Sequence, residues 1–176
     1  MAIDSRLVFP IGTVEMSKMN LTEFLEWQEQ QAQRYEFYRG EIFAVADETA
    51  RHNRVVLNLA SRIGNHLNGT PCQVFAMSMK VQILDGMLYP DVMVTCAKAE
   101  AGDELTVTNP RLIIEVISPG CDKRYKFTLY RTLASLREYV LIDPARRQVE
   151  LFTLAQDGAW LPAEQTRAGG FCRVKR

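Results

Sequence analysis

Two acidic residues stand where the surrounding sequence is strongly apolar. Glu115 lies within LIIEVIS (residues 112–118), which has the composition of a strand buried on both faces, and Asp91 lies between Pro90 and the apolar run Val92–Val94. A buried carboxylate is costly unless a partner compensates its charge. Two facing carboxylates would raise one pKa sharply, because like charges at short range cannot both ionise cheaply. A hard divalent cation prefers oxygen ligands and would neutralise both, so the pattern indicates a metal site.

Lys126 is the third residue whose type suits this chemistry. It lies in the helix predicted to follow the Glu115 strand, and a helix that packs back onto its own sheet can direct an ammonium toward the acids. Two carboxylates, a lysine and one Mg²⁺ are a minimal set for phosphodiester hydrolysis. Each residue alone has a structural alternative: Asp91 as a strand-entry turn residue, Glu115 as the ion-pair partner of Arg111 or Arg131, and Lys126 as a solvated side chain. Their joint occurrence favours the metal site.

Length and composition are those of one ordinary soluble domain. The chain has 176 residues, 47% hydrophobic and 24% charged, and its 21 Lys and Arg balance its 21 Asp and Glu. Zero net charge argues against a generic nucleic-acid-binding protein, which would be strongly basic. No apolar run approaches the ~20 residues that span a membrane, and the N-terminus has no signal-peptide pattern. We expect a cytoplasmic protein with no membrane association, a loosely held arm over residues 1–18, and a single domain over residues 19–176.

Cysteine and histidine do not form a recognisable metal or redox motif. The sequence contains four widely spaced cysteines: Cys72, Cys96, Cys121 and Cys172. Because none is in CxxC spacing, a zinc ribbon and a redox pair are disfavoured, and we expect reduced thiols packed as small hydrophobes. His52 and His66 are too far apart to share a helix turn. A histidine at a helix start, such as His52, is more often a surface or capping residue, so it is left outside the catalytic set.

Periodicity and turn signals define the elements that would position these residues. We predict three helices and several strands: helices over 20–32, 50–67 and 122–133, and strands over 35–39, 41–46, 73–77, 79–84, 88–96, 112–118, 139–142 and 149–153. The spacing of Asn20 and Glu23 predicts a capping box at the first helix. This order indicates an α/β or α+β domain with a mixed sheet flanked by helices. The sequence has no GxGxxG, GxxxxGK[ST] or GxSxG motif, which excludes the corresponding enzyme classes.

The run PDVMV…PRLIIEVISP…DKRYKF…YR…EYVLID resembles the Uma-two family, a branch of the PD-(D/E)XK nuclease superfamily. The likeness covers roughly residues 20–153 and includes RYEFYRGEIFAVA and RHNRVVLNLASRIGNHL. It implies an α/β, restriction-endonuclease-like fold with a central mixed β-sheet flanked by helices. It maps Asp91 onto the PD aspartate and Glu115 onto the acid of the second motif. The motif lysine would fall at Ile117, and in this branch a lysine of the following helix, here Lys126, substitutes for it.

The same resemblance implies a metal-dependent endonuclease that hydrolyses phosphodiester bonds in DNA. Mg²⁺ is the implied cofactor, and Mn²⁺ could substitute. Glu36, in YEFYRG, matches an early acidic position that helps to hold metal or orient water. The implied metal ligands are therefore Asp91, Glu115 and Glu36, and Lys126 would activate water or stabilise the pentacovalent phosphate. Asp122 either caps the third helix or takes a direct part.

Two other functions are compatible with this pattern. A catalytically inactive nuclease-fold module that binds nucleic acid is favoured by the zero net charge and by Ile117. A phosphatase or nuclease that acts on small nucleotides would use the same metal site. Because cutting both strands of a duplex usually takes two active sites, the endonuclease hypothesis favours a homodimer or a higher homo-oligomer.

Overall fold

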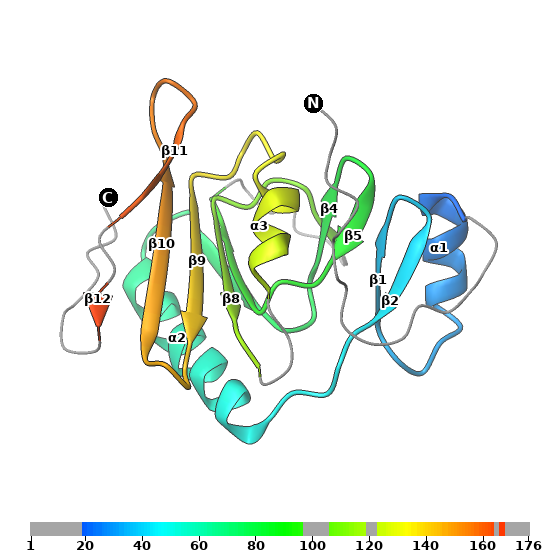
Figure 1. The fold of residues 1–176 in the computed structure, drawn as a ribbon, viewed down its shortest axis with the longest axis horizontal. Helices are drawn as coiled ribbons and strands as arrows, with labels where there is room; N and C mark the ends of the chain where they lie inside the picture. Colours follow the sequence, from blue (N-terminus) through cyan, green and yellow to red (C-terminus); the bar gives the residue numbers. More distant parts are fainter. Residues whose placement is uncertain (1–18, 97–105, 119–122, 164–165, 168–176) are drawn as a thin grey trace.

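A mixed sheet forms the centre of the fold in the computed structural model, which describes residues 19–96, 106–118, 123–163 and 166–167 (Figure 1). Its strands are ordered β11-β10-β9-β8-β6-β3, and β12 pairs with β10. Their bounds are β3 Gln73–Ala76, β6 Val92–Thr95, β8 Leu112–Val116, β9 Glu138–Asp143, β10 Gln148–Leu154, β11 Trp160–Pro162 and β12 Thr166–Arg167. Strands β8 and β9 are parallel, and the other neighbours are antiparallel. The predicted central mixed sheet is confirmed.

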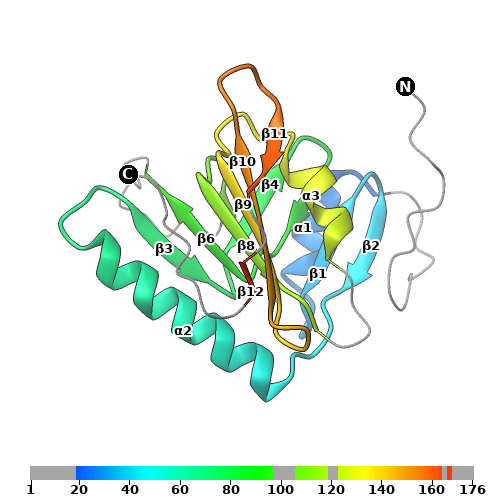
Figure 2. The ribbon, with the colours of Figure 1, turned by 60° about the vertical axis from the view of Figure 1, so that its left-hand side comes forward.

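Helices cover both faces of this sheet, α2 (Ala50–Leu67) on one face and α3 (Arg124–Tyr130) on the other (Figure 2). Successive residues of β8 face α2 and α3 in turn, because neighbouring side chains of a strand point to opposite faces of the sheet. Ile114 packs in a cluster with Val56 of α2, whereas Ile113 packs in a cluster with Leu129 of α3. Glu115 has the same parity as Ile113, so it faces α3 and not α2.

A second sheet, ordered β2-β1-β5-β4-β7, lies beside the first. Its elements and the helix that packs on it are α1 Leu21–Gln28, β1 Tyr35–Tyr38, β2 Glu41–Ala44, β4 Lys80–Ile83, β5 Gly86–Leu88 and β7 Thr106–Val107. Phe24 of α1 stacks on Phe37 of β1 at a ring distance of 4.9 Å. Gly86 is needed where β5 meets β1, because a Cβ there would lie 2.3 Å from the carbonyl oxygen of Phe37. The sequence did not predict this separate sheet.

The chain passes from the second sheet to the first through Tyr89, Pro90 and Asp91. The sequence predicted one strand over residues 88–96, but β5 ends at Leu88 and β6 begins at Val92. Pro90 has no N–H and cannot continue a ladder, which accounts for the break. Asp91 is therefore placed at the junction of the two sheets, at the start of β6.

Helix boundaries follow the predicted capping signals. The Asn20 side chain accepts from the Glu23 N–H at 3.0 Å, and the Glu23 carboxylate accepts from the Asn20 N–H at 2.8 Å, so the capping box is confirmed. Helix α1 ends at Gln28, before the predicted residue 32, because the Gln28 side chain binds the backbone of Gln33 and Tyr35 and turns the chain into β1. The bounds of α2 agree with the prediction.

Cys72 and Cys96 form a disulfide, so the expectation of reduced thiols is wrong for this pair. The last β3–β6 pair is Gln73 with Thr95, and the two cysteines face each other one position further. Sequence spacing missed this contact because only the antiparallel pairing of β3 and β6 brings the residues together. Cys121 and Cys172, like the predicted arm over residues 1–18, lie outside the described residues. Within the described ranges, no helix has the length and apolar character that a membrane crossing requires.

Candidate active site

Asp91 and Glu115 lie opposite each other on neighbouring strands. Strands β6 and β8 pair antiparallel with Val92 opposite Ile114, so the same register puts Asp91 opposite Glu115. Both are buried, with exposed fractions of 8% and 0%. The backbone N–H of Val116 donates to Asp91 Oδ2 at 2.6 Å, which fixes the aspartate against β8. The two acids therefore converge where the sequence predicted a metal site.

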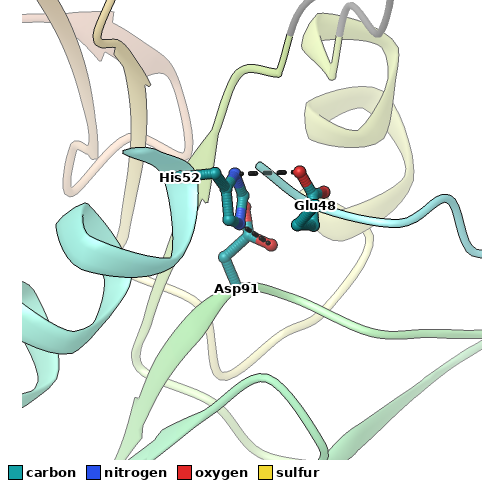
Figure 3. Close-up of side chains that lie close together, drawn as sticks. All are labelled: Glu48, His52 and Asp91. Atoms are coloured by element: carbon teal, nitrogen blue, oxygen red, sulfur yellow. Dashed lines mark ion pairs between the residues drawn. The ribbon is translucent and has the colours of Figure 1, made fainter. Parts of the chain in front are cut away.

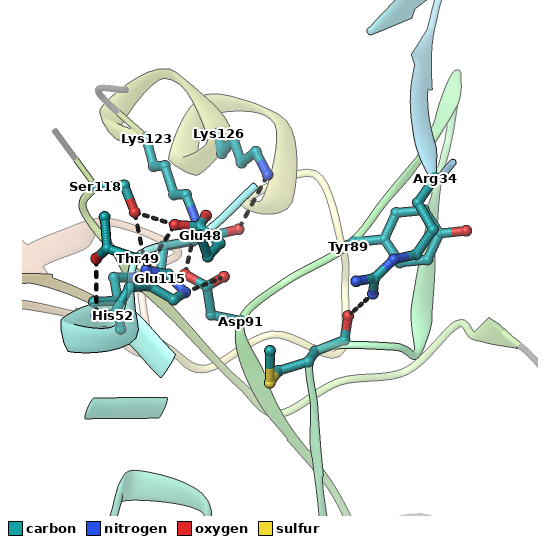
Figure 4. Close-up of polar contacts among 12 residues, drawn as sticks. Arg34, Glu48, Thr49, His52, Tyr89, Asp91, Glu115, Ser118, Lys123 and Lys126 are labelled. Atoms are coloured by element: carbon teal, nitrogen blue, oxygen red, sulfur yellow. Dashed lines mark hydrogen bonds and ion pairs between the residues drawn. The ribbon is translucent and has the colours of Figure 1, made fainter. Parts of the chain in front are cut away.

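Lys123, which was not among the residues predicted from the sequence, bridges the two acids (Figure 4). Its Nζ lies 2.7 Å from Asp91 Oδ2 and 3.3 Å from Glu115 Oε2. The second contact is an ion pair without hydrogen-bond alignment, and Glu115 Oε2 is a buried oxygen that accepts no hydrogen bond within the described residues. One feature of the sequence could have identified Lys123. It precedes Lys126 by three residues, a spacing that puts both ammoniums on the same side of a helix.

Lys126 joins Glu115 to Glu36 on β1. Its Nζ lies 2.6 Å from Glu36 Oε1 and 3.5 Å from Glu115 Oε1. The Tyr130 hydroxyl donates to Glu115 Oε1 at 2.9 Å, and the Tyr89 N–H donates to Glu36 Oε1 at 2.9 Å. The structure thus brings all four residues selected from the sequence into one network.

The ion-pair partners of Glu115 are two lysines of the following segment. Neither Arg111 nor Arg131, the alternatives considered from the sequence, forms a described ion pair with it. Asp122 lies outside the described residues, and Lys123 occupies the N-cap position of α3 without a side-chain cap.

His52 extends the network on the other side of Asp91 (Figure 3). Its Nε2 lies 3.3 Å from Asp91 Oδ1 and its Nδ1 lies 3.2 Å from Glu48 Oε2. The Ser118 hydroxyl lies 3.1 Å from His52 Nδ1 and also donates to Glu48. The expectation that His52 is a surface or capping residue is wrong, because its exposed fraction is 2%. His52 lies four residues before the buried Val56, on the same face of α2, and this spacing could have predicted that His52 is buried.

The charges of the network are set by burial and by close partners. Burial alone would raise the pKa of Asp91, but the His52 hydrogen bond and the Lys123 charge hold it far below its usual range. Burial raises the pKa of Glu115 to about 7, against the opposing effect of Lys126 and Lys123. Burial would lower the pKa of both lysines, but the facing carboxylates outweigh it and raise each pKa above its usual value. Both ammoniums therefore remain charged at neutral pH.

A cavity of about 760 Å³ opens beside this network. Its lining combines three cations, Arg34, Lys123 and Lys126, with neighbouring residues and four acids: Glu36, Asp47, Glu48 and Asp91. The volume lies within the range of small-ligand and cofactor sites. A substrate in this cavity would meet the charged network directly.

The side chains present fit a hard divalent cation. Glu48, His52 and Asp91 offer three ligand atoms that all lie within 4.8 Å of one another. Glu115 adds a buried oxygen that accepts no described hydrogen bond. Carboxylate oxygens suit Mg²⁺ and Mn²⁺, and one imidazole suits Mn²⁺ as well. Of the metal ligands predicted from the sequence, Asp91 belongs to this group of three, whereas Glu115 and Glu36 do not.

The chain is similar in sequence to two proteins of Synechocystis sp.. It is 36% identical over 153 residues to the uncharacterized protein sll1609 of Synechocystis sp. (strain PCC 6803), with 83% of this chain and 86% of that protein covered. It is 32% identical over 149 residues to the uncharacterized protein slr1290 of the same organism, with 82% and 78% covered.

A solved structure supports the fold. The crystal structure described as "a putative nuclease belonging to DUF820" from Anabaena variabilis matches with a TM-score of 0.74 at 17% identity, and 89% of each chain is covered. A likeness at this identity shows the fold alone, and the predicted restriction-endonuclease-like class is confirmed.

A family model covers nearly the whole chain. The model of Uma2, described as "Putative restriction endonuclease", matches residues 21–174. This range contains every residue of the charged network. The chain belongs to the Uma2 family, and its family and fold are those of restriction-endonuclease-like nucleases.

Proposed function

We propose that this protein is a Mg²⁺-dependent endonuclease that hydrolyses phosphodiester bonds in DNA. The observation that carries the proposal is the convergence of Asp91 and Glu115 on one buried ammonium beside a cavity, with one Glu115 oxygen that accepts no described hydrogen bond. Such an arrangement is costly for folding, and buried acids with charged partners beside a cavity cluster at functional sites.

Asp91 and Glu115 would hold the cation, and Glu36 would assist from the second sheet. Mn²⁺ could take the same position. Glu48 and His52 would support Asp91 from the side of α2, through the contacts of 3.2 and 3.3 Å made by His52. When bound, the cation would polarise the phosphate and lower the pKa of a water molecule.

Lys126 would stabilise the charge that develops on the phosphate. Its pKa is raised well above its usual value because the charges of Glu115 and Glu36 outweigh the effect of burial. A lysine that stays protonated offsets negative charge but does not accept a proton, so electrostatic stabilisation is favoured over water activation for Lys126. Lys123 lines the same cavity and would contribute a second positive charge.

One observation favours the inactive, nucleic-acid-binding alternative. Lys123 already stands between Asp91 and Glu115, where it partly compensates both acids without any metal. In a binding module this ammonium would be a permanent counter-ion, whereas in a nuclease it would have to move as the cation binds. The two functions therefore differ in whether Mg²⁺ or Mn²⁺ binds at these acids.

A cleavage assay tests the proposal. Supercoiled plasmid is incubated with the protein and Mg²⁺ or Mn²⁺, and wild type is compared with Asp91→Asn and Glu115→Gln, which keep the side-chain shapes. The matched control is Asp85→Asn, whose carboxylate pairs with Arg39 at an exposed turn. We expect cleavage by wild type and the control, and loss in both site variants. Equal cleavage by all four proteins, or cleavage in excess chelator, contradicts the proposal.

We further propose that the endonuclease acts as a homodimer or a higher homo-oligomer, since two strands are to be cut. Sedimentation velocity with and without a DNA duplex tests this. A monomer in both conditions contradicts it, without bearing on the metal site.

A further inference from the structure

Arg34 is an exposed guanidinium in the cavity beside the charged network. Among the cations that line the cavity in the described part of the chain, Lys123 and Lys126 are buried and paired with carboxylates, whereas Arg34 is exposed. Its described side-chain hydrogen bond goes to the carbonyl of Met77. A guanidinium has five N–H donors, so most of its donors are available to a ligand.

The position of Arg34 is fixed by two neighbours (Figure 4). The Met77 carbonyl accepts from its Nη1, and the ring of Tyr89 lies 5.6 Å below its central carbon. Met77 has a φ of 67°, a left-handed conformation that is strained for a residue with a side chain. The backbone is thus held in an unfavourable conformation at the residue that presents its carbonyl to Arg34. This is the arrangement of a pre-positioned binding group.

Both neighbours of Arg34 also contact the acids of the network. The Met77 N–H donates to the Asp91 carbonyl at 3.0 Å, and the Tyr89 N–H donates to Glu36 Oε1 at 2.9 Å. Arg34 also extends strand β1, since its carbonyl accepts from Val45 at 2.9 Å. Arg34 and Glu36, two residues apart on one strand, therefore point to the same side. Met77 thus contacts both Arg34 and Asp91, and Tyr89 contacts both Arg34 and Glu36.

We propose that Arg34 forms a second phosphate-binding position, which takes the backbone phosphate next to the one at the metal site. The planar fork of a guanidinium matches the oxygens of a phosphate, and stacking on an aromatic ring keeps the fork oriented. Arg34 and Asp91 line the same cavity, so a DNA strand bound there could present one phosphate to the metal site and the next to Arg34. The inference rests on the proposed function, because it adds a substrate contact to that same site.

Direct binding tests the position of this contact without any turnover. Fluorescence anisotropy of a labelled DNA duplex is measured with Ca²⁺ in place of Mg²⁺ for wild type, Arg34→Gln and Arg34→Lys. The matched control is Arg39→Gln: Arg39 also stacks on a tyrosine, at 5.2 Å, but it pairs with Asp85 and lies outside the cavity lining. We expect Arg34→Gln to weaken binding about tenfold, with partial recovery in Arg34→Lys and little change in the control.

Salt dependence and a small ligand separate a phosphate contact from a general loss of affinity. Loss of one phosphate contact should reduce the slope of log K against log salt by about 0.9. Binding of a deoxynucleoside monophosphate should be unchanged in Arg34→Gln, because its single phosphate would occupy the metal site. An equal loss for the duplex and the monophosphate would overturn the second position, and so would equal losses in Arg34→Gln and Arg34→Lys.

The outcomes also separate this inference from the proposed function. Suppose that wild type cleaves DNA and that Arg34→Gln has the same DNA affinity and the same KM as wild type. This result would overturn the inference and leave the nuclease proposal standing. Arg34-dependent DNA binding without any cleavage would support the inference and contradict the nuclease proposal. Failure of wild type to bind the duplex would overturn the inference as well. If both hold, Arg34→Gln raises KM more than it lowers kcat, and Mn²⁺ affinity by calorimetry stays unchanged.

Discussion

The ammonium of Lys126 lies 2.6 Å from Oε1 of Glu36, and this contact joins α3 to the second sheet. Both groups are buried, so water compensates little of either charge. The contact therefore contributes to folding as well as to the electrostatics of the cavity.

Replacement of Lys126 by Met should be strongly destabilising. It would leave the buried carboxylates of Glu36 and Glu115 without this ammonium, and breaking a buried pair from one side costs about 3–5 kcal/mol. Urea denaturation measures the loss. The double variant Lys126→Met with Glu36→Gln should lose less than the sum of the single variants, because one uncompensated charge is removed. Additive losses would show that the two residues do not interact.

Lys123→Met should increase the stabilisation that a divalent cation provides. In wild type the Lys123 ammonium lies 2.7 Å from Asp91, near the position that the cation would take. Without this ammonium, Asp91 and Glu115 repel each other in the metal-free protein. A cation that binds only the folded state raises the melting temperature of the protein, and it should do so more in the variant. Thermal denaturation with and without Mn²⁺ gives the comparison. A smaller Mn²⁺ shift in Lys123→Met than in wild type would contradict this expectation.

Glu115 should make the metal-free protein less stable as pH rises. Its folded pKa is raised by burial to about 7 from an ordinary value of 4.5, so the folded state binds the proton more tightly. This contribution to stability is fully present below pH 4.5 and is lost as pH rises through 7, by at most about 3 kcal/mol. The free energy of unfolding is measured from pH 4.5 to 8 for wild type and for Glu115→Gln. The value for wild type minus the value for the variant should fall as pH rises. A difference that grows with pH would refute it.

His52→Asn should weaken Mn²⁺ binding about 10- to 100-fold, the usual cost of losing a partner of a metal ligand. His52 contacts Asp91 at 3.3 Å and belongs to the group that could hold a metal. His66→Asn is the matched control, since His66 lies exposed on the same helix. Calorimetric titration with Mn²⁺ compares the two variants, and equal affinities would remove His52 from the site.

The double variant with Cys72 and Cys96 replaced by Ser should be about 3 kcal/mol less stable than the oxidised wild type, because the disulfide closes a loop with a sequence separation of 24. The site lies at the opposite end of β6, so Mn²⁺ affinity should stay the same. Denaturation with and without reductant measures the effect. Equal stability of wild type and the double variant under oxidising conditions would show that the bond is not formed.

Local signals in the sequence predicted much of the fold. The capping box at Asn20 and the periodicity over Ala50–Leu67 define helices through contacts a few residues apart. Asp91 and Glu115 were recognisable because a carboxylate within an apolar strand is anomalous wherever the strand lies. The second sheet, the Cys72–Cys96 bond and the contact of His52 with Asp91 depend on pairings between distant segments, which no local pattern encodes.

Selection between the two lysines was also beyond the sequence. Lys123, the N-cap of α3, and Lys126 in its first turn are three residues apart, and only the packing of α3 determines which ammonium meets Asp91 and which meets Glu36.

The passage of the chain from β5 to β6 through Pro90 has a consequence for biosynthesis. Glu36 comes from the first hairpin, Asp91 from the junction of the sheets, and both lysines from the segment around α3. A nascent chain that has not yet emerged beyond α3 carries acids without their ammoniums. A truncated or half-translated copy therefore lacks the complete set of charges, and the network of acids and ammoniums forms only after the segment through α3 has left the ribosome.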